Sequence, residues 1–317
     1  MTTRSAGHLL KDAILRANGK VGGSSVLTHV PQPLRRPFSS AEALEHESVR
    51  AIDVGEARTS PSGTGFLDGI QRYSVAGRFG LVPVVRGYVA AAVLGRRDER
   101  LSVQHHASEE FIAVSVDRLS ADQLRQLETT GLTLYDSGGV DREHPILDVH
   151  LAARVVESRR ESVELAVMQL HLREHPVSWL VVDGSITSYL GQENSSRILG
   201  LIKSHETQYL DGIDLRTALT LPAGYRSSVF ARNTAERNKA HSWYLRLWPW
   251  DEHDLLHGLV RLERAPIAEA VEQASEISAW MLSERSPLSA PDSRWDRLIY
   301  PIRQVESYLR AHVEGWL

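Results

Sequence analysis

Cysteine is absent from this sequence of 317 residues. Its absence excludes disulfide bonds, thiolate zinc sites and cysteine nucleophiles, so a metal ion would have to be bound by carboxylate, imidazole or carbonyl groups. Hard divalent cations such as Mg²⁺ and Mn²⁺ suit that ligand set. Any metal chemistry of this chain therefore has to be sought among its acidic and histidine residues.

Long apolar runs are also absent. No segment approaches the roughly 20 apolar residues that a membrane-spanning helix requires. The first twenty residues carry charged side chains where a secretory signal would have an apolar core, namely Arg4, Lys11, Asp12, Arg16 and Lys20. We therefore expect a cytoplasmic protein with no membrane-spanning segment.

The glycine patterns of nucleotide-binding and dinucleotide-binding loops are missing too, so the chain is not expected to power translocation itself. A basic charge balance is lacking as well, because 36 Lys and Arg oppose 40 Asp and Glu. Proteins that bind nucleic acids normally present a basic surface. Residues 225–246 are locally basic, however, and Arg226 and Arg232 in this stretch are candidates for contacts with phosphate groups. An ordinary solvated surface explains the stretch equally well.

The composition, 42% hydrophobic and 24% charged, is ordinary for a globular protein with one large domain or two smaller ones. We divide the chain into an N-terminal helical arm with a connector, residues 1–55, and a main domain, residues 56–317. The arm is expected to contain a helix at 7–18, a connector punctuated by proline at 31–37 and a short helix at 40–51.

The main domain is predicted to be α/β. Apolar runs of strand length predict an antiparallel meander at 65–68, 81–94 and 111–116. A long helix at 148–174 then leads into a buried strand at 179–183. Later elements are expected at 195–202 and 216–220, a strand at 241–248, and helices at 252–262, 266–284 and 303–314. This order indicates a mixed sheet flanked by helices.

Two aspartates share one local design, since Asp68 and Asp183 each follow an apolar strand and precede a glycine. A strand that is buried up to its last residue places that carboxylate at the rim of the sheet, and the glycine lets a ligand approach the backbone closely. Each aspartate taken alone is more simply explained as turn chemistry. Their similarity predicts two carboxylates that meet across neighbouring strands.

A third carboxylate is expected from the long helix, because a site for a hard metal ion normally uses several carboxylates. The apolar side chains of this helix form one narrow stripe, made by Val156, Val163, Val167 and Leu170. Among the candidates Glu157, Glu161 and Glu164, the last lies at the border of the stripe and can reach the rim of the sheet. Glu161 lies near the opposite side and is expected to face solvent.

Several short motifs, taken in order, resemble the NurA family of nucleases over about residues 60–310. They are the Asp-Gly strand at 66–69, the helix with Arg160 and Glu164, and the segments 180–185, 200–203, 221–227, 243–248 and 300–301. Members of this family resemble RNase H-like enzymes that use a divalent metal ion, usually Mn²⁺, to cut DNA. They pair with hexameric translocases of the HerA type.

The resemblance implies an RNase H-like core in residues 56–317, with Asp68, Glu164 and Asp183 as ligands of Mn²⁺ or Mg²⁺. Lys203, at the end of a strand, would hold a phosphate group as a point charge, although an exposed lysine is an equally simple interpretation. Tyr300 matches a late tyrosine of the family and would orient water or phosphate, or serve in packing. DNA, a HerA-like hexameric ATPase and a second copy of the chain are the implied partners, in DNA end processing or anti-phage defence.

Two positions depart from the family pattern. Glu306 stands where the family has a catalytic histidine, unless His312 supplies the imidazole from the next turns, and Ile70 stands where the family often has serine. These departures motivate an alternative, a catalytically weak or inactive adaptor that binds a ring ATPase and DNA. The three retained acids favour the nuclease.

A further alternative rests on a histidine pair. His253 and His257 have the i, i+4 spacing of zinc hydrolases, although Asp254 stands where those enzymes need glutamate. An acidic helix start explains this segment more simply.

Overall fold

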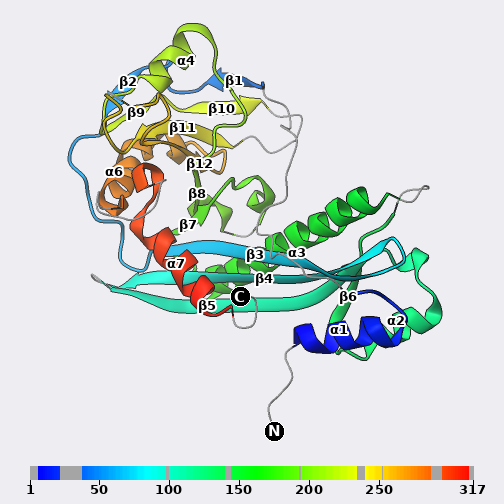
Figure 1. Ribbon diagram of the computed structural model, residues 1–317. Helices are drawn as coiled ribbons and strands as arrows, with labels where there is room; N and C mark the ends of the chain where they lie inside the picture. The colour runs from blue at the N-terminus through cyan, green and yellow to red at the C-terminus, as the bar shows by residue number, and fades with distance from the viewer. Residues whose placement is uncertain are drawn as a thin grey trace.

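The computed structural model describes residues 6–21, 38–97, 100–139, 144–192, 194–233, 240–251, 253–286 and 295–313. Figure 1 shows a long, twisted antiparallel meander with helices on both faces, joined to a second group of shorter strands. The expected proline-rich connector at 31–37 lies outside the described residues.

One sheet of twelve strands runs through the described part of the molecule. Its strands are β1 Ser40–Ala43, β2 Ala51–Asp53, β3 Gly65–Phe79, β4 Val82–Arg97, β5 Arg100–Val114, β6 Thr133–Asp136, β7 Leu180–Asp183, β8 Ile198–Ile202, β9 Tyr225–Ser227, β10 Phe230–Asn233, β11 His241–Arg246 and β12 Leu259–Arg264. The order is β1-β10-β11-β12-β8-β7-β3-β4-β5-β6, with β9 beside β11 and β2 beside β9.

The helices are α1 Ala6–Arg16, α2 Ala121–Glu128, α3 Pro145–Glu174, α4 Gly212–Leu219, α5 Glu269–Glu272, α6 Ala274–Glu284 and α7 Tyr300–Ala311, with 3₁₀ turns at Val116–Arg118, Thr187–Tyr189, Ser195–Arg197 and Trp295–Arg297. Among the helices of the described residues, none is both long and apolar enough to cross a membrane. The longest, α3, begins at a proline, which suits the first helical position, and Pro176 follows shortly after its end.

The centre of the sheet has the order β5-β4-β3-β7-β8. Strands β3, β7 and β8 are parallel to one another, while β4 is antiparallel to both of its neighbours. Helix α3 connects the meander to β7. This arrangement confirms the predicted α/β class, with a mixed sheet flanked by helices.

The two faces of the meander are covered by different helices. Since successive side chains of a strand point to opposite faces of the sheet, neighbouring residues of β3 pack against different helices. Leu67 and Val93 face α3, in a core cluster that includes Val156 of that helix. Phe66 faces the opposite side, in a cluster that includes Val305 of α7. Figure 1 shows α3 and α7 on opposite faces of the long strands. Up to the bulge after Val75, a side chain of β3 therefore faces α3 at an odd position and α7 at an even position.

Two expected helices are wrong. The segment at 40–51 contains β1, which pairs with β10, and leads into β2, which pairs with β9. The segment at 252–262 consists of turns and the start of β12 in its described residues. In both segments, pairing with distant strands overrides the local helical preference. His253 and His257 consequently lie in turns, with stacked rings, and not on a helix that presents a zinc motif.

Candidate metal centre

The parallel pairing of β3 with β7 brings the two aspartates side by side. The last pair in this register is Leu67 with Val182, so that the next positions are Asp68 and Asp183. Adjacent strands lie about 4.8 Å apart. Both aspartates were predicted to lie at the ends of their strands. This is correct for Asp183, the last residue of β7, but wrong for Asp68, because β3 continues beyond it to Phe79.

The backbone after Asp183 turns away from the sheet at Gly184, whose φ of +117° is a conformation that favours glycine. The Gly184 N–H donates a hydrogen bond of 2.9 Å to the carbonyl of Leu201 on β8. This turn leaves the Asp183 side chain partly exposed at the end of its strand.

Lys203 lies directly after β8, and its ammonium group donates to the Asp183 carboxylate at 2.7 Å. The predicted position of Lys203 beside the aspartates is therefore observed. In this structure the lysine forms an ion pair with Asp183, and its side chain is 18% exposed. It is therefore not the freely exposed surface lysine of the alternative interpretation.

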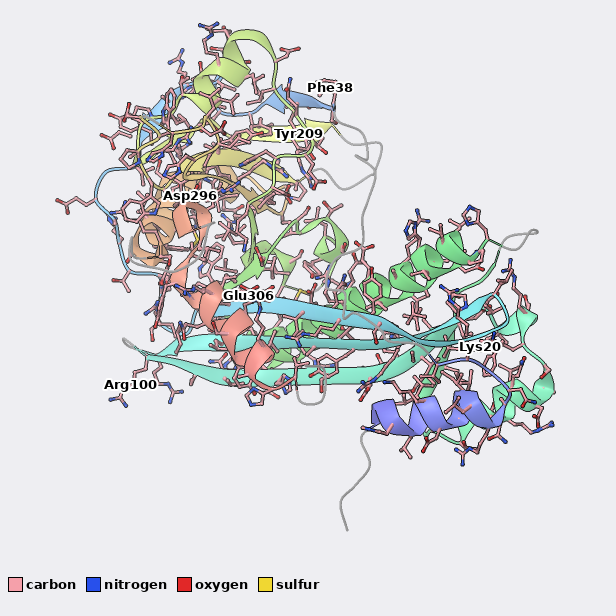
Figure 2. The ribbon with its side chains drawn as sticks, in the orientation of Figure 1. Lys20, Phe38, Arg100, Tyr209, Asp296 and Glu306 are labelled. Atoms are coloured by element: carbon pink, nitrogen blue, oxygen red, sulfur yellow. The ribbon has the colours of Figure 1, made fainter. Side chains whose placement is uncertain are left out.

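Glu306 lies on α7, which crosses the long strands of the meander (Figure 2). Phe66 packs in the cluster on the α7 side, and Asp68, two residues later on the strand, faces the same side. Its negative charge is one of those that act on Asp68. It also accepts a hydrogen bond from Arg310 at 2.5 Å. His312 lies farther along the chain, where its ring contacts Tyr308 at a centroid distance of 4.2 Å. The structure therefore puts Glu306 among the charges that act on Asp68.

Glu164 reaches the site from α3, on the other face of the sheet. It is 5% exposed, forms an ion pair with Arg160, and accepts a hydrogen bond of 3.3 Å from the Tyr189 hydroxyl. Its carboxylate lies directly over Gly69, where a Cβ atom would be 2.1 Å from Glu164 Oε1. The absence of a side chain at Gly69 thus makes room for Glu164, whereas the sequence suggested that it makes room for a ligand. Glu161 is exposed, as the helical-wheel argument predicted.

Negative charge accumulates at this site beyond what its cations balance. Burial, and then repulsion by Asp183, raises the pKa of Asp68 well above its ordinary value, while Lys203 opposes the shift. Burial also raises the pKa of Glu164, with Arg160 opposing it. A divalent cation bound among these carboxylates would relieve their repulsion, and oxygen ligands are those that Mn²⁺ and Mg²⁺ prefer. These oxygen donors are therefore of the type that such an ion prefers; Glu164 offers its carboxylate from the α3 face of the sheet, and Asp68 lies on the α7 face.

The other predicted site residues lie elsewhere or have other partners. Tyr300 is the first residue of α7 and is 43% exposed. Arg226 is 4% exposed and binds the carboxylate of Glu45 through two nitrogen atoms at 2.8 Å. Arg232 is 5% exposed and lies 3.1 Å from buried Glu263. Because both guanidinium groups neutralise carboxylates inside the protein, we do not place them in a DNA interface.

Sequence reasoning missed Tyr189, the residue that donates to Glu164. It lies in a short 3₁₀ turn after β7, and no local pattern marks it. Ile70, one of the departures from the family pattern, packs against the cluster that contains Val305. Its apolar side chain therefore helps to seat α7 on the sheet.

No protein-family model matches this sequence, and no curated protein matches it. Among solved structures, the crystal structure of the NurA nuclease from Sulfolobus solfataricus is similar, with a TM-score of 0.45 and 13% sequence identity. The similarity covers 84% of this chain and 89% of that chain.

Proposed function

We propose that this chain is a metal-dependent DNA nuclease, which hydrolyses phosphodiester bonds at the site formed by Asp68, Glu164 and Asp183. The observation that carries the proposal is the meeting of Asp68 and Asp183 on adjacent parallel strands, with Glu164 brought over Gly69 from α3. Two of these carboxylates, Asp68 and Glu164, have raised pKa values, and perturbed pKa values of this kind are typical of functional sites.

In this proposal the three carboxylates bind Mn²⁺ or Mg²⁺. Such an ion, when bound, lowers the pKa of an attacking water and neutralises charge on the scissile phosphate. Lys203 stands 2.7 Å from Asp183 and would bind a phosphate oxygen as a point charge. Arg160 and Tyr189 hold Glu164 in place, which makes them positioning residues. Glu306 would accept a hydrogen bond from water or act as an additional ligand.

The test is cleavage of end-labelled linear DNA by the purified full chain, with and without added Mn²⁺. Asp183→Asn keeps the shape of the side chain but removes a ligand charge, so we expect metal-dependent cleavage to disappear while the fold is retained. Asp117→Asn, at an exposed position in a 3₁₀ turn, is the matched control and should cut normally. Cleavage by Asp183→Asn at the wild-type rate would show that the metal site is assigned wrongly.

The second candidate function is a catalytically weak adaptor that binds DNA and a ring ATPase. One observation favours it, namely the hydrogen bond that ties Glu306 to Arg310 at the position of the family's histidine. A carboxylate there does not act as an imidazolium acid near neutral pH. The adaptor predicts DNA and partner binding without cleavage at any Mn²⁺ concentration, and this result would replace the nuclease proposal.

We further propose that the chain acts as a cytoplasmic homodimer with a HerA-like hexameric ATPase, in DNA end processing or anti-phage defence. The lack of a phosphate-binding loop supports an external motor. Adding such an ATPase, encoded nearby, should increase the rate of DNA cleavage in the presence of ATP. Failure of the two proteins to co-sediment would count against the partnership, while cleavage by the chain alone would still support the nuclease.

A further inference from the structure

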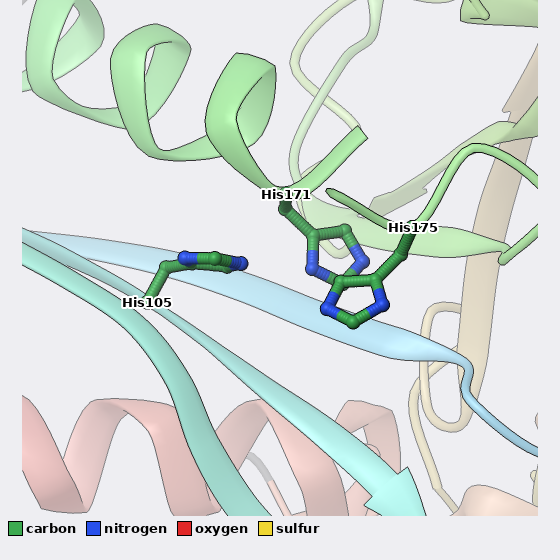
Figure 3. A group of neighbouring side chains, drawn as sticks. All are labelled: His105, His171 and His175. Carbon is green, nitrogen blue, oxygen red and sulfur yellow. The ribbon is translucent and has the colours of Figure 1, made fainter. Parts of the chain in front are cut away.

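A second group of potential metal ligands lies between α3 and the meander. It consists of His105 on β5 and of His171 and His175 at the end of α3 (Figure 3). One ligand nitrogen from each ring can be chosen so that all three lie within 4.8 Å of one another. The ring centroids are 4.9 Å apart for His171 and His175, and 5.5 Å apart for His105 and His171.

Local structure explains why these three rings converge. His171 and His175 are separated by four residues at the end of a helix, so both point to the same side, one turn apart. His105 pairs with Val93, whose side chain packs in the cluster facing α3. The register of β4 and β5 shifts beside this pair, at a bulge that contains Gln104. Such bulges re-aim side chains and are common beside functional sites.

The buried imidazole of His171 has unmet hydrogen-bonding capacity. The ring is completely buried, and neither of its nitrogen atoms has a hydrogen-bond partner among the described residues. His105 Nε2 is likewise buried and has no hydrogen-bond partner in that part of the chain. Buried polar nitrogen atoms normally have a partner, because leaving them without one costs free energy. A metal ion shared by the rings would provide it.

Room for a fourth ligand exists on the outer side of the cluster. The Glu174 carboxylate lies 3.7 Å from His105 Nε2. A cavity of ≈ 430 Å³ is lined by His105, His175 and Glu174, together with Ser62, Gly63, Ser102, Gln104 and the cationic side chains Arg96 and Arg97. Its polar walls and its volume admit water to the histidines. Three imidazoles with one carboxylate or water are a ligand set that tetrahedral Zn²⁺ commonly takes.

We propose that His105, His171 and His175 bind one Zn²⁺ ion, with Glu174 or a water molecule as the fourth ligand, and that this ion fastens the end of α3 to β5. Imidazole ligands favour zinc and similar transition metals, whereas the oxygen ligands of the Asp68 site favour Mg²⁺ and Mn²⁺. The two sites therefore select different ions.

Helix α3 carries a ligand of each site. Glu164 and His171 are seven residues apart, which corresponds to about 10.5 Å along the helix. Fastening the end of the helix would limit the movement of Glu164 over Gly69. The zinc site does not rest on the proposed nuclease function, because its three ligands and its cavity are separate from the carboxylates.

The test is metal binding by the full chain in an Asp183→Asn background, which weakens the carboxylate site. After treatment with a chelator, Zn²⁺ is titrated calorimetrically, and Co²⁺ is used as a probe whose visible absorption reports tetrahedral coordination. We expect one equivalent of Zn²⁺ and an intense Co²⁺ spectrum. Zinc should also raise the midpoint of thermal unfolding, since it binds the native state.

His105→Gln and His175→Gln should each weaken Zn²⁺ binding more than about 100-fold, beyond the loss typical of residues that only support a ligand. Both positions adjoin the cavity, so these variants should fold even if the variant of fully buried His171 does not. His150→Gln, at an exposed position on the same helix, is the matched control and should bind normally. Absence of Zn²⁺ binding, unchanged binding in both variants, or equal affinity for Mg²⁺ would overturn the proposal.

Discussion

Gly69→Ala is the substitution that tests the geometry of the carboxylate site most directly. The new Cβ atom would lie 2.1 Å from Glu164 Oε1 and 2.8 Å from both Cδ and Cγ. Real Cβ atoms do not approach other atoms so closely, so the glutamate has to move. Arg160 and Tyr189 hold it in a nearly closed environment, where it is 5% exposed. The substitution should therefore displace a proposed metal ligand without touching the metal ion.

The cost in stability follows from what Glu164 loses. A hydrogen bond to a charged group contributes about 1.5–3 kcal/mol, and overpacking of a closed site costs about 1–3 kcal/mol. Against these stands a gain of about 0.4–1 kcal/mol, because alanine restricts the unfolded chain more than glycine. Gly69→Ala should thus lower the free energy of unfolding by about 2–4 kcal/mol. In a Glu164→Ala background the same change should cost nearly nothing or stabilise.

The assay is a double-mutant cycle by urea unfolding, followed by tryptophan fluorescence, with DNA cleavage measured on each folded variant. We expect a coupling between positions 69 and 164 of roughly 2–4 kcal/mol, together with loss of Mn²⁺-dependent cleavage in Gly69→Ala. If Gly69→Ala proved as stable and as active as the wild type, the placement of Glu164 over this strand would be refuted. Additive costs in the double variant would lead to the same conclusion.

Three further predictions concern single side chains. Glu164→Gln should reduce DNA cleavage far more than Glu161→Gln, which alters an exposed position of the same helix; equal rates would contradict the role of α3. Burial lowers the pKa of His205 to about 4, below its ordinary value of about 6.5, so protons bind preferentially to the unfolded chain and stability is lost as the pH falls through this window. The free energy of unfolding should fall by roughly 3 kcal/mol in the wild type and by less in His205→Gln, as measured by urea midpoints between pH 4 and 7. Parallel plots of the free energy of unfolding against pH for the two proteins would contradict this prediction. Glu306→Ala should reduce cleavage at limiting Mn²⁺ with partial rescue by excess metal, whereas His312→Ala should be mild, and the reverse order would assign the role to the histidine.

Local patterns predicted much of the framework correctly. The helix that begins near residue 7 was predicted and is α1, Ala6–Arg16. Helix α3 and strand β7 were also found, because one has helical periodicity and the other is a short apolar run. The apolar stripe of α3 was less accurate, since Leu170 is 37% exposed.

The corrections occur where distant segments decide the structure. Residues 40–43 and 51–53 become strands because they pair with β10 and β9, about 180 residues later in the chain. Arg226 and Arg232 were read from a basic stretch as surface residues, but each lies against a carboxylate from another element. His171 and His175 carry the same spacing as His253 and His257, yet only the former pair lies at the end of a helix, with His171 in its last turn and His175 directly after it. Periodicity in one segment contains no information about these partners.

The position of the carboxylate site depends on register in the same way. Three residues of β3, from Gly65 to Leu67, pair with β7. The aspartates meet because they occupy the next position in this register on each strand. A slip of one residue would turn Asp68 toward α3 and Leu67 toward α7, and would separate Asp68 from Asp183. The alternation of Phe66 and Leu67 between two apolar clusters opposes such a slip, because either side chain would lose its packing. The hydrophobic residues that precede the first aspartate therefore determine which acids it meets.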